Sequence, residues 1–194
     1  MKIYSYLNIE QFSNCYLVIN EMTMQALMID PCKIHPKILA QIESGPYHLD
    51  AVLITHNHAG HIRGLSTLRK IYEPKIYAAD YEVASSQTIV IKDDGVLRIA
   101  GMEVRYFSIP GHSFDSMAFQ IGRVIFTGDV ITAGLIGKTY SNYAKGGLIS
   151  IMEAKILSQD DSTVMLPGHG PPTSVGAEKK YNIDIQWNKP PWTL

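Results

Sequence analysis

Short apolar segments, separated by glycine, proline and polar residues, recur along the whole chain. Their apolar patterns predict strands at residues 2–7, 14–20, 25–30, 51–55, 75–78, 88–91, 95–99, 102–109, 117–121, 123–127 and 163–166. Apolar residues at helical spacing predict helices at 36–42, 61–69 and 148–157, with a short helix near Ser174. Strands and helices are interleaved, which favours sheets covered by helices in one α/β (α+β) domain spanning residues 1–194.

Histidines gather where the predicted strands end. Five of the seven histidines, together with one aspartate, stand in four short loops that read HNHAGH, PGH, TGD and PGHG. Loops that follow strands of one sheet edge can converge on one point, so we expect their side chains to meet. The residues concerned are His56, His58, His61, His112, Asp129 and His169.

Three histidines within six residues, His56, His58 and His61, indicate a metal site. Imidazole nitrogen is a ligand for zinc and iron, and three histidines with one carboxylate and an open position suit a catalytic ion. The alternative is that these histidines are structural or lie at the surface. A chain of this length can bury a core without a structural metal, which favours a functional ion.

Composition and charge narrow the classes of function. Seventeen Lys and Arg against 18 Asp and Glu give a net charge of −1, so no basic excess is available for nucleic acid. No apolar run reaches the length of a membrane helix and no signal sequence opens the chain, so we expect a soluble, cytoplasmic protein. Cys15 and Cys32 are expected to be reduced thiols, and nothing indicates the oligomeric state.

The motifs THNHAGH, PGHS, TGD and PGHG, in this order, resemble those of the metallo-β-lactamase-fold hydrolases, and of their glyoxalase II-like branch in particular. The resemblance covers nearly the whole chain, from MIDP around Asp30 to the tail PGHGPPTSVGAEKKYN. It implies a four-layer αββα sandwich with the metal site at one edge. It also implies a chain without the C-terminal helical domain that helps full-length glyoxalase II enzymes to bind glutathione.

The same resemblance implies a role for each residue in the loops. A first ion would be held by His56, His58 and His112, a second by His61 and His169, and Asp129 would bridge the two. Asp129 and His61 would also serve catalysis. Zinc is the expected metal, as one or two ions, with iron or manganese as alternatives. In the family, water between the metals attacks a carbonyl or phosphoryl centre.

Gly60 breaks the family pattern His-x-His-x-Asp-His, because it stands at the Asp position. In the family that carboxylate is a ligand of the second metal, and in many members it also takes part in proton transfer. Without it the centre carries one negative charge fewer, so we expect one tightly bound ion and a weak second site. His61, His169, Asp129 and a water could still complete a second tetrahedron.

Four polar residues lie outside the ligand set, and two of them, both aspartates, have alternative interpretations. Asp115, where the family usually has Gly, either compensates for the missing carboxylate or caps a turn. Asp30 either orients a ligand histidine through its second ring nitrogen or begins a turn. His35 and His48 match no ligand motif and are expected at the surface or in packing.

The segment from Gly134 to Gly147 is predicted to be a long connection that binds substrate. Its candidate residues are Lys138, Tyr140 and Tyr143, because a cation and aromatic rings could hold an anionic substrate tail. The family has a GRTD-like segment here, with Lys138 at the Arg position. A solvated loop without a binding role is the alternative.

These observations favour a metal-dependent hydrolase of a thioester or another small acyl substrate. One alternative is a mononuclear iron enzyme similar to the persulfide dioxygenases, which use two histidines of the first set with the TGD aspartate. Another is a metal-binding protein without catalysis. Bound zinc would favour hydrolysis, whereas ferrous iron with oxygen uptake would favour the dioxygenase.

Overall fold

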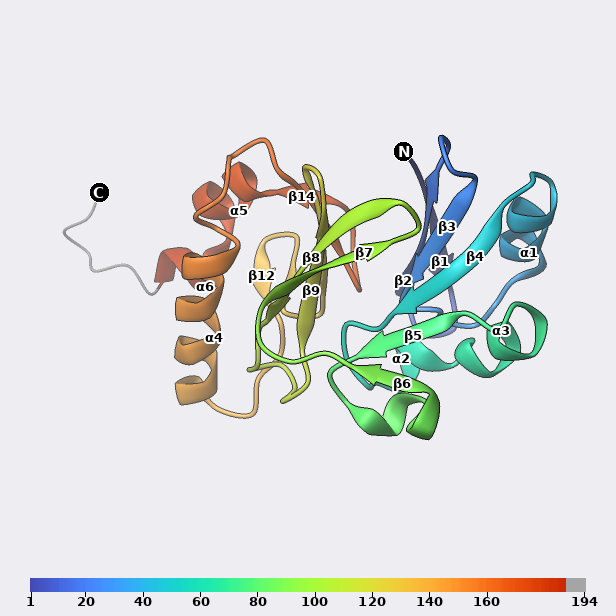
Figure 1. Cartoon of the computed structure of the whole chain (residues 1–194). Helices are drawn as coiled ribbons and strands as arrows, with labels where there is room; N and C mark the ends of the chain where they lie inside the picture. Colours follow the sequence, from blue (N-terminus) through green and yellow to red (C-terminus); the bar gives the residue numbers. More distant parts are fainter. Residues whose placement is uncertain (188–194) are drawn as a thin grey trace.

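Two six-stranded sheets pack face to face in the computed structural model, which describes residues 1–187 (Figure 1). Residues 188–194, the last part of the predicted domain, lie outside the described residues. The first sheet has the spatial order β1 (Lys2–Asn8), β2 (Ser13–Asn20), β3 (Gln25–Ile29), β4 (His48–Leu53), β5 (Lys75–Ala78) and β6 (Thr88–Val90). It is antiparallel from β1 to β3 and parallel from β3 to β6.

The second sheet is mixed as well. Its spatial order is β14 (Thr173–Ser174), β13 (Val164–Pro167), β10 (Val124–Gly128), β9 (Met117–Ile121), β8 (Met102–Ser108) and β7 (Gly95–Ile99). Only the pair of β10 with β13 is parallel. A small hairpin of β11 (Ile131–Thr132) and β12 (Leu135–Ile136) follows β10.

Helices cover the outer face of each sheet (Figure 1). The first sheet carries α1 (Pro36–Glu43), α2 (Ala59–Ile62) and α3 (Leu65–Ile71), and the 3-10 turns η1 (Tyr81–Val83) and η2 (Ser85–Gln87) follow β5. The second sheet carries α4 (Asn142–Lys155), α5 (Val175–Tyr181) and α6 (Ile183–Trp187). Within residues 1–187, no helix has the length and apolarity needed to cross a membrane.

Three apolar clusters hold the four layers together. On β2, Leu17 and Ile19 face the helices while Tyr16 and Val18 face the opposite sheet, which explains why this strand is apolar without alternation. Leu148 and other residues of α4 pack on the outer face of the second sheet. The predicted α/β sandwich of αββα order is therefore confirmed.

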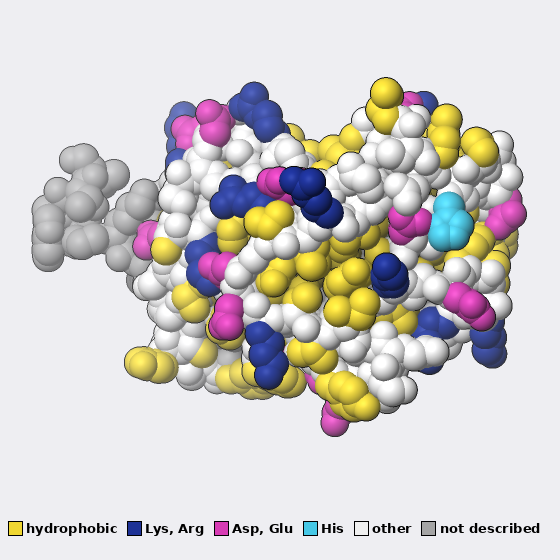
Figure 2. Space-filling model, in the orientation of Figure 1, with side chains coloured by type: hydrophobic (Ala, Val, Ile, Leu, Met, Phe, Trp, Pro, Cys, Tyr) yellow, Lys and Arg dark blue, Asp and Glu magenta, His cyan; other side chains and the backbone are white. Residues whose placement is uncertain are grey.

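The surface of one face mixes both charge signs, as the net charge of −1 suggests. On the face shown in Figure 2, Lys and Arg side chains alternate with Asp and Glu, and apolar side chains gather along the seam between the two sheets.

Two helices differ from the sequence prediction. The helix predicted at 61–69 is broken at Gly64, whose N–H donates to the carbonyl of Pro31 and whose Cβ position would lie 2.0 Å from the carbonyl oxygen of Cys32. The helix predicted at 148–157 begins at Asn142, so the second half of the predicted connection 134–147 is helical. The Ser141 side chain caps the start of this helix. Burial of the helix's apolar face outweighs the cost of about 1 kcal/mol for each glycine within the helix.

Candidate metal centre

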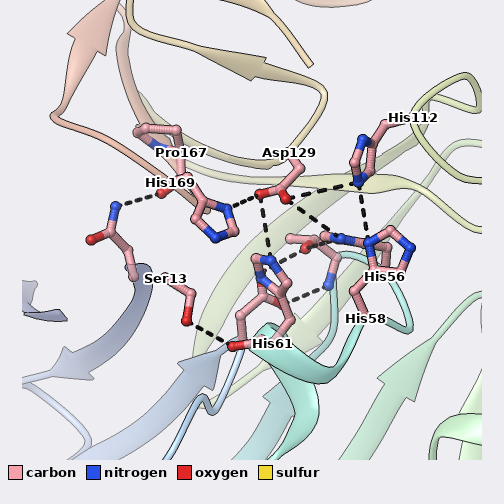
Figure 3. Close-up of polar contacts among 12 residues, drawn as sticks. Ser13, His56, His58, His61, His112, Asp129, Pro167 and His169 are labelled. Carbon is pink, nitrogen blue, oxygen red and sulfur yellow. Dashed lines mark hydrogen bonds and ion pairs between the residues drawn. The ribbon is translucent and has the colours of Figure 1, made fainter. Parts of the chain in front are cut away.

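The side chains of the four histidine and aspartate loops come together at the carboxyl ends of β4, β8, β10 and β13 (Figure 3). The segment after β4 supplies three of them, and each other strand supplies one. They are His56, His58, His61, His112, Asp129 and His169. Strand ends hold the loops in place, so residues up to 113 positions apart along the chain become neighbours.

One group of ligand atoms surrounds Oδ2 of Asp129. His58 Nδ1 lies 3.2 Å from His112 Nε2, and the Nε2 atoms of His56 and His112 each lie 3.8 Å from Asp129 Oδ2. Ligand atoms bonded at about 2.0–2.1 Å to one tetrahedral zinc ion lie about 3.3 Å apart, so these four side chains could hold one divalent ion. His56 Nε2 is buried without a hydrogen-bond partner among residues 1–187, which a cation would satisfy.

The other carboxylate oxygen faces a second group. His61 Nε2 lies 3.4 Å from Asp129 Oδ1, and His169 Nδ1 lies 2.8 Å from the same oxygen. His61 Nε2 is buried and makes no hydrogen bond within the described chain. The two oxygens of Asp129 thus face different histidines, as a carboxylate shared between two ions would (Figure 3).

Hydrogen bonds on the far side of each ring determine which nitrogen is free. Asp30 Oδ2 lies 2.9 Å from His61 Nδ1 and accepts a 2.6 Å hydrogen bond from Thr55 Oγ1. Thr55 Oγ1 in turn lies 3.1 Å from His56 Nδ1 and can accept its proton, and the carbonyl of Lys138 can accept that of His112 Nδ1 at 2.8 Å. These partners place protons on Nδ1, so the Nε2 lone pairs of His56 and His112 are free for a metal, and that of His61 becomes free when its second proton leaves.

The metal-free groups differ in charge. Burial is the main cause that lowers the pKa of His56, to about 2, and burial with the nearby His112 also lowers the pKa of His58. Burial alone would also lower the pKa of His61, but Asp30 and Asp129 outweigh it and raise this pKa to about 10. At neutral pH without metal, His56 and His58 are therefore neutral, whereas His61 is protonated on both ring nitrogens and carries a positive charge.

Asp129 stays ionised under the same conditions. Burial would raise its pKa, but the hydrogen bond from His169 and the charge of the nearby His61 outweigh that effect and hold the pKa well below the usual range. A carboxylate at the centre is therefore available to a cation at neutral pH.

The PGHG loop is fastened to β2, a connection that the sequence motifs do not indicate. Asn14 N–H donates to the Gly168 carbonyl at 2.7 Å, and Tyr16 OH donates to the Pro167 carbonyl at 2.7 Å. A Cβ at Gly168 would lie 2.3 Å from Asp129 Oδ1 and 2.6 Å from His61 Cε1. Only glycine fits this approach to the centre, and the glycine of PGHG was the signal for it in the sequence.

Gly60 has no such constraint. The nearest atoms that a Cβ at this position would meet, apart from its chain neighbours, lie 3.7 Å away on Gln11 and Ser13. Among the described residues, mutually close ligand atoms form the groups His56, His58 and His112, and His56, His61 and Asp129, and Asp115 enters neither of them. Its Oδ2 instead accepts a 2.6 Å hydrogen bond from the backbone N–H of Asn57, between the first two histidines of the motif.

A cavity of about 360 Å³ opens beside His58. Of the three predicted substrate residues, Tyr140 lines it, Tyr143 lines a different depression along α4, and Lys138 contributes its carbonyl to His112. Acidic and aromatic side chains dominate the wall, which includes His58, Asp80, Glu82, Phe114, Asp115 and Tyr140.

The remaining histidines and the cysteines lie outside the ligand groups. Exposed His35 caps α1 by accepting from Lys37 N–H, and exposed His48 pairs with Asp50 at 2.5 Å. Cys15 and Cys32 are buried free thiols.

Comparisons with known proteins find relatives by sequence and by fold. A family model described as "Anti-Pycsar protein Apyc1" matches residues 5–81. The hydroxyacylglutathione hydrolase of Chromohalobacter salexigens is 26% identical over 157 residues, which cover 79% of this chain and 60% of that protein. The hydroxyacylglutathione hydrolase GloC of Haemophilus influenzae is 26% identical over 195 residues, which cover 87% of this chain and 91% of that protein.

Two solved structures have the same fold. ETHE1 from Myxococcus xanthus has a TM-score of 0.86 at 24% identity, covering 98% of this chain and 93% of its own. A metallo-β-lactamase from Staphylococcus aureus has a TM-score of 0.85 at 20% identity, covering 97% of this chain and 64% of its own. The chain therefore has the metallo-β-lactamase fold, and its sequence is similar to those of hydroxyacylglutathione hydrolases.

Proposed function

We propose that this protein is a metal-dependent hydrolase of a thioester or another small acyl substrate, built as one domain over residues 1–194. The observation that carries the proposal is the division of the histidines around the two oxygens of Asp129, with imidazole nitrogens on both sides that lack hydrogen-bond partners within the described chain.

The residues present suit a divalent ion such as zinc. His56, His58, His112 and Asp129 would hold the first ion, and His61 and His169 with Asp129 would hold a second. A divalent ion there would supply Lewis-acid activation of a carbonyl group and of water. Manganese and iron also accept imidazole and carboxylate ligands.

The chain's own residues would orient the reactants. Asp129 is partly buried and ionised, so it holds charge at the centre rather than storing a proton. Asp30 fixes the ring of His61 by its contact with Nδ1, and the Gly168 backbone leaves room for both side chains. The cavity beside His58 would admit the acyl group.

A thioester suits a centre without the family carboxylate. The leaving thiol has an ordinary pKa of about 8.5, so it can depart as a thiolate and needs little help from a proton donor. An alkoxide or an amide nitrogen would need a proton, and Gly60 supplies no group to give one. The relatives described as hydroxyacylglutathione hydrolases support the same class of substrate.

A second candidate function rests on His56, His112 and Asp129. Their free Nε2 atoms both lie 3.8 Å from Oδ2, which gives the two-histidine, one-carboxylate set that non-haem iron oxygenases use. In this case the protein would bind one ferrous ion and consume oxygen with a persulfide substrate.

The test measures metal content and turnover of protein purified without a polyhistidine tag. Thioesters with and without a glutathione moiety are assayed for thiol release, and oxygen uptake is followed with glutathione persulfide. The proposal expects zinc-dependent thiol release that His56→Ala and His112→Ala remove and the exposed control His48→Ala retains. Oxygen uptake with iron would favour the second candidate, and bound metal without turnover on either panel would contradict both.

A further inference from the structure

Gln11 places a buried oxygen beside the position where the family carboxylate is missing. The residue lies in the turn that precedes β2, and its Oε1 is buried with no hydrogen-bond partner within residues 1–187. A buried amide oxygen without a partner costs about 1–3 kcal/mol, so its presence calls for an explanation such as an ion.

The position of this oxygen matches that of an absent side chain. Gln11 Oε1 lies 3.7 Å from the Cβ position of Gly60, the same distance as the Ser13 side chain, and apart from the chain neighbours of Gly60 no described residue is nearer. A carboxylate oxygen is two bonds from its Cβ, so an aspartate at position 60 would direct its oxygens into the space that the Gln11 oxygen borders. An aspartate at position 60 and the glutamine at position 11 would thus supply oxygen to the same place.

The segment that carries Gln11 is tied to both sides of the second ligand group. Ser13 Oγ donates a 2.9 Å hydrogen bond to the Gly60 carbonyl, next to His61, and Ser13 forms a β-bridge with His169 (Figure 3). The start of β2 therefore lies between the motif that supplies His61 and the loop that supplies His169.

We propose that Gln11 Oε1 is the oxygen donor that replaces the missing carboxylate for a second divalent ion, together with His61, His169 and Asp129. Carbonyl oxygen is an accepted ligand of divalent cations, and it is neutral, so the second ion would bind more weakly than one held by aspartate. This inference rests on the metal centre of the proposed function and adds a ligand to it.

Titration of the metal-free protein with zinc by calorimetry tests the proposal, with bound zinc counted by mass spectrometry after dialysis. The natural protein is expected to bind two ions with different affinities. Gln11→Met keeps the size of the side chain but removes the oxygen, and it should weaken the second ion at least about tenfold, with the first ion changed by less than about twofold. Gln11→Glu should strengthen the second ion about tenfold, because it adds a negative charge.

Gln120→Met is the matched control. Gln120 lies on β9 and also has a buried Oε1 without a partner in the described chain, but it lines a depression with Met1 and Gly122 rather than the histidine cluster. It should leave both zinc affinities unchanged. In a Gly60→Asp background, Gln11→Met should lose its effect, because the new carboxylate takes the same place.

The outcomes separate this inference from the proposed function. A second ion that binds Gln11→Met with natural affinity would overturn the inference, as would a natural protein that binds one ion at every zinc concentration. Thioester turnover with one ion would leave the proposed function standing. Two bound ions without turnover would contradict the proposed function and leave the role of Gln11 as a metal ligand standing. If Gln11→Met fails to fold, the response to Gln11→Glu decides.

Discussion

The loop after β4 supplies histidines to both halves of the cluster, the first with His56, His58 and His112 and the second with His61 and His169, yet the two halves differ in their readiness for a metal. In the first half, His56 and His58 are neutral in the metal-free protein, and free nitrogens face one oxygen of Asp129. In the second half, His61 is protonated, and His169 Nδ1 is hydrogen-bonded to the other oxygen of Asp129.

The missing family carboxylate therefore falls on one side of the centre. Gly60 lies beside the second half, and so does the protonated His61, whereas the first half keeps its ligand types and their supporting hydrogen bonds. A metal therefore finds the first half ready, and must displace a proton to enter the second.

The strongest way to abolish the contrast is to remove the residue that both halves share. Asp129→Ala should lose both ions and lower thioester turnover at least about 100-fold, because removal of a supporting partner alone costs 10- to 100-fold. Zinc content and thiol release check this, with the surface variant Asp50→Ala as control. First-ion affinity that survives in Asp129→Ala would show that the histidines hold this ion without the carboxylate.

Asp30→Asn should sharpen the contrast. The buried carboxylate contacts His61 Nδ1 and accepts from both the N–H and the hydroxyl of Thr55, so its loss should weaken the second ion about 10- to 100-fold. The left-handed backbone of Asp30, with φ of 48°, suits asparagine as well. Zinc titration should show the first ion changed by less than about threefold, and equal weakening of both ions would refute the division into halves.

Substitution by alanine should destabilise the protein at one of the two glycines beside the second half and have little effect at the other. Gly168→Ala places a Cβ against Asp129 and His61 and should destabilise the metal-free protein by about 1–3 kcal/mol, the usual cost of overpacking. Gly60→Ala meets only ordinary contacts and should change the free energy of unfolding by less than about 1 kcal/mol. Urea denaturation measures both, and equal losses would mean that Gly60 is required by the backbone.

The fold and the residues of the histidine cluster could be predicted from the sequence, whereas most of the residues that hold the cluster in place could not. Motif histidines follow strands, and strand ends are visible as apolar runs, so the αββα order could be inferred and is confirmed. Thr55, Tyr16 and Gln11 carry no motif. Their importance comes from contacts with residues distant along the chain, which no local pattern encodes.

In the segment 134–147, by contrast, the local pattern gave a prediction that was wrong. Gly146 and Gly147 indicate a loop by composition, but they lie inside α4, because Ser141 caps the helix and Leu148 anchors it in the core. The substrate residues assigned to that loop are therefore distributed over separate surfaces, and only Tyr140 of the three lines the cavity beside His58.

A change of pH should alter the zinc affinity of the second half more than that of the first. The pKa of His61 is raised to about 10, so the stability it adds to the metal-free protein is complete below pH 6.5 and is lost as pH rises through 10. A second ion must displace this proton, so its affinity should rise about tenfold per pH unit between pH 7 and 9. Calorimetry in buffers of different ionisation enthalpy should count about one proton for the second ion and fewer for the first. Equal counts would contradict the assignment of the proton to His61.

Asp115 gives the smallest expected effect and tests whether any other carboxylate compensates for Gly60. Its Oδ2 accepts from Asn57 N–H, and an asparagine oxygen can accept the same hydrogen bond, so Asp115→Asn should retain its zinc content and lose turnover by less than about threefold. Asp115→Ala should cost more, because the loop between His56 and His58 loses its anchor. Loss of the second ion in Asp115→Asn would instead show that its charge serves that ion, and the role proposed for Gln11 would then have to be shared.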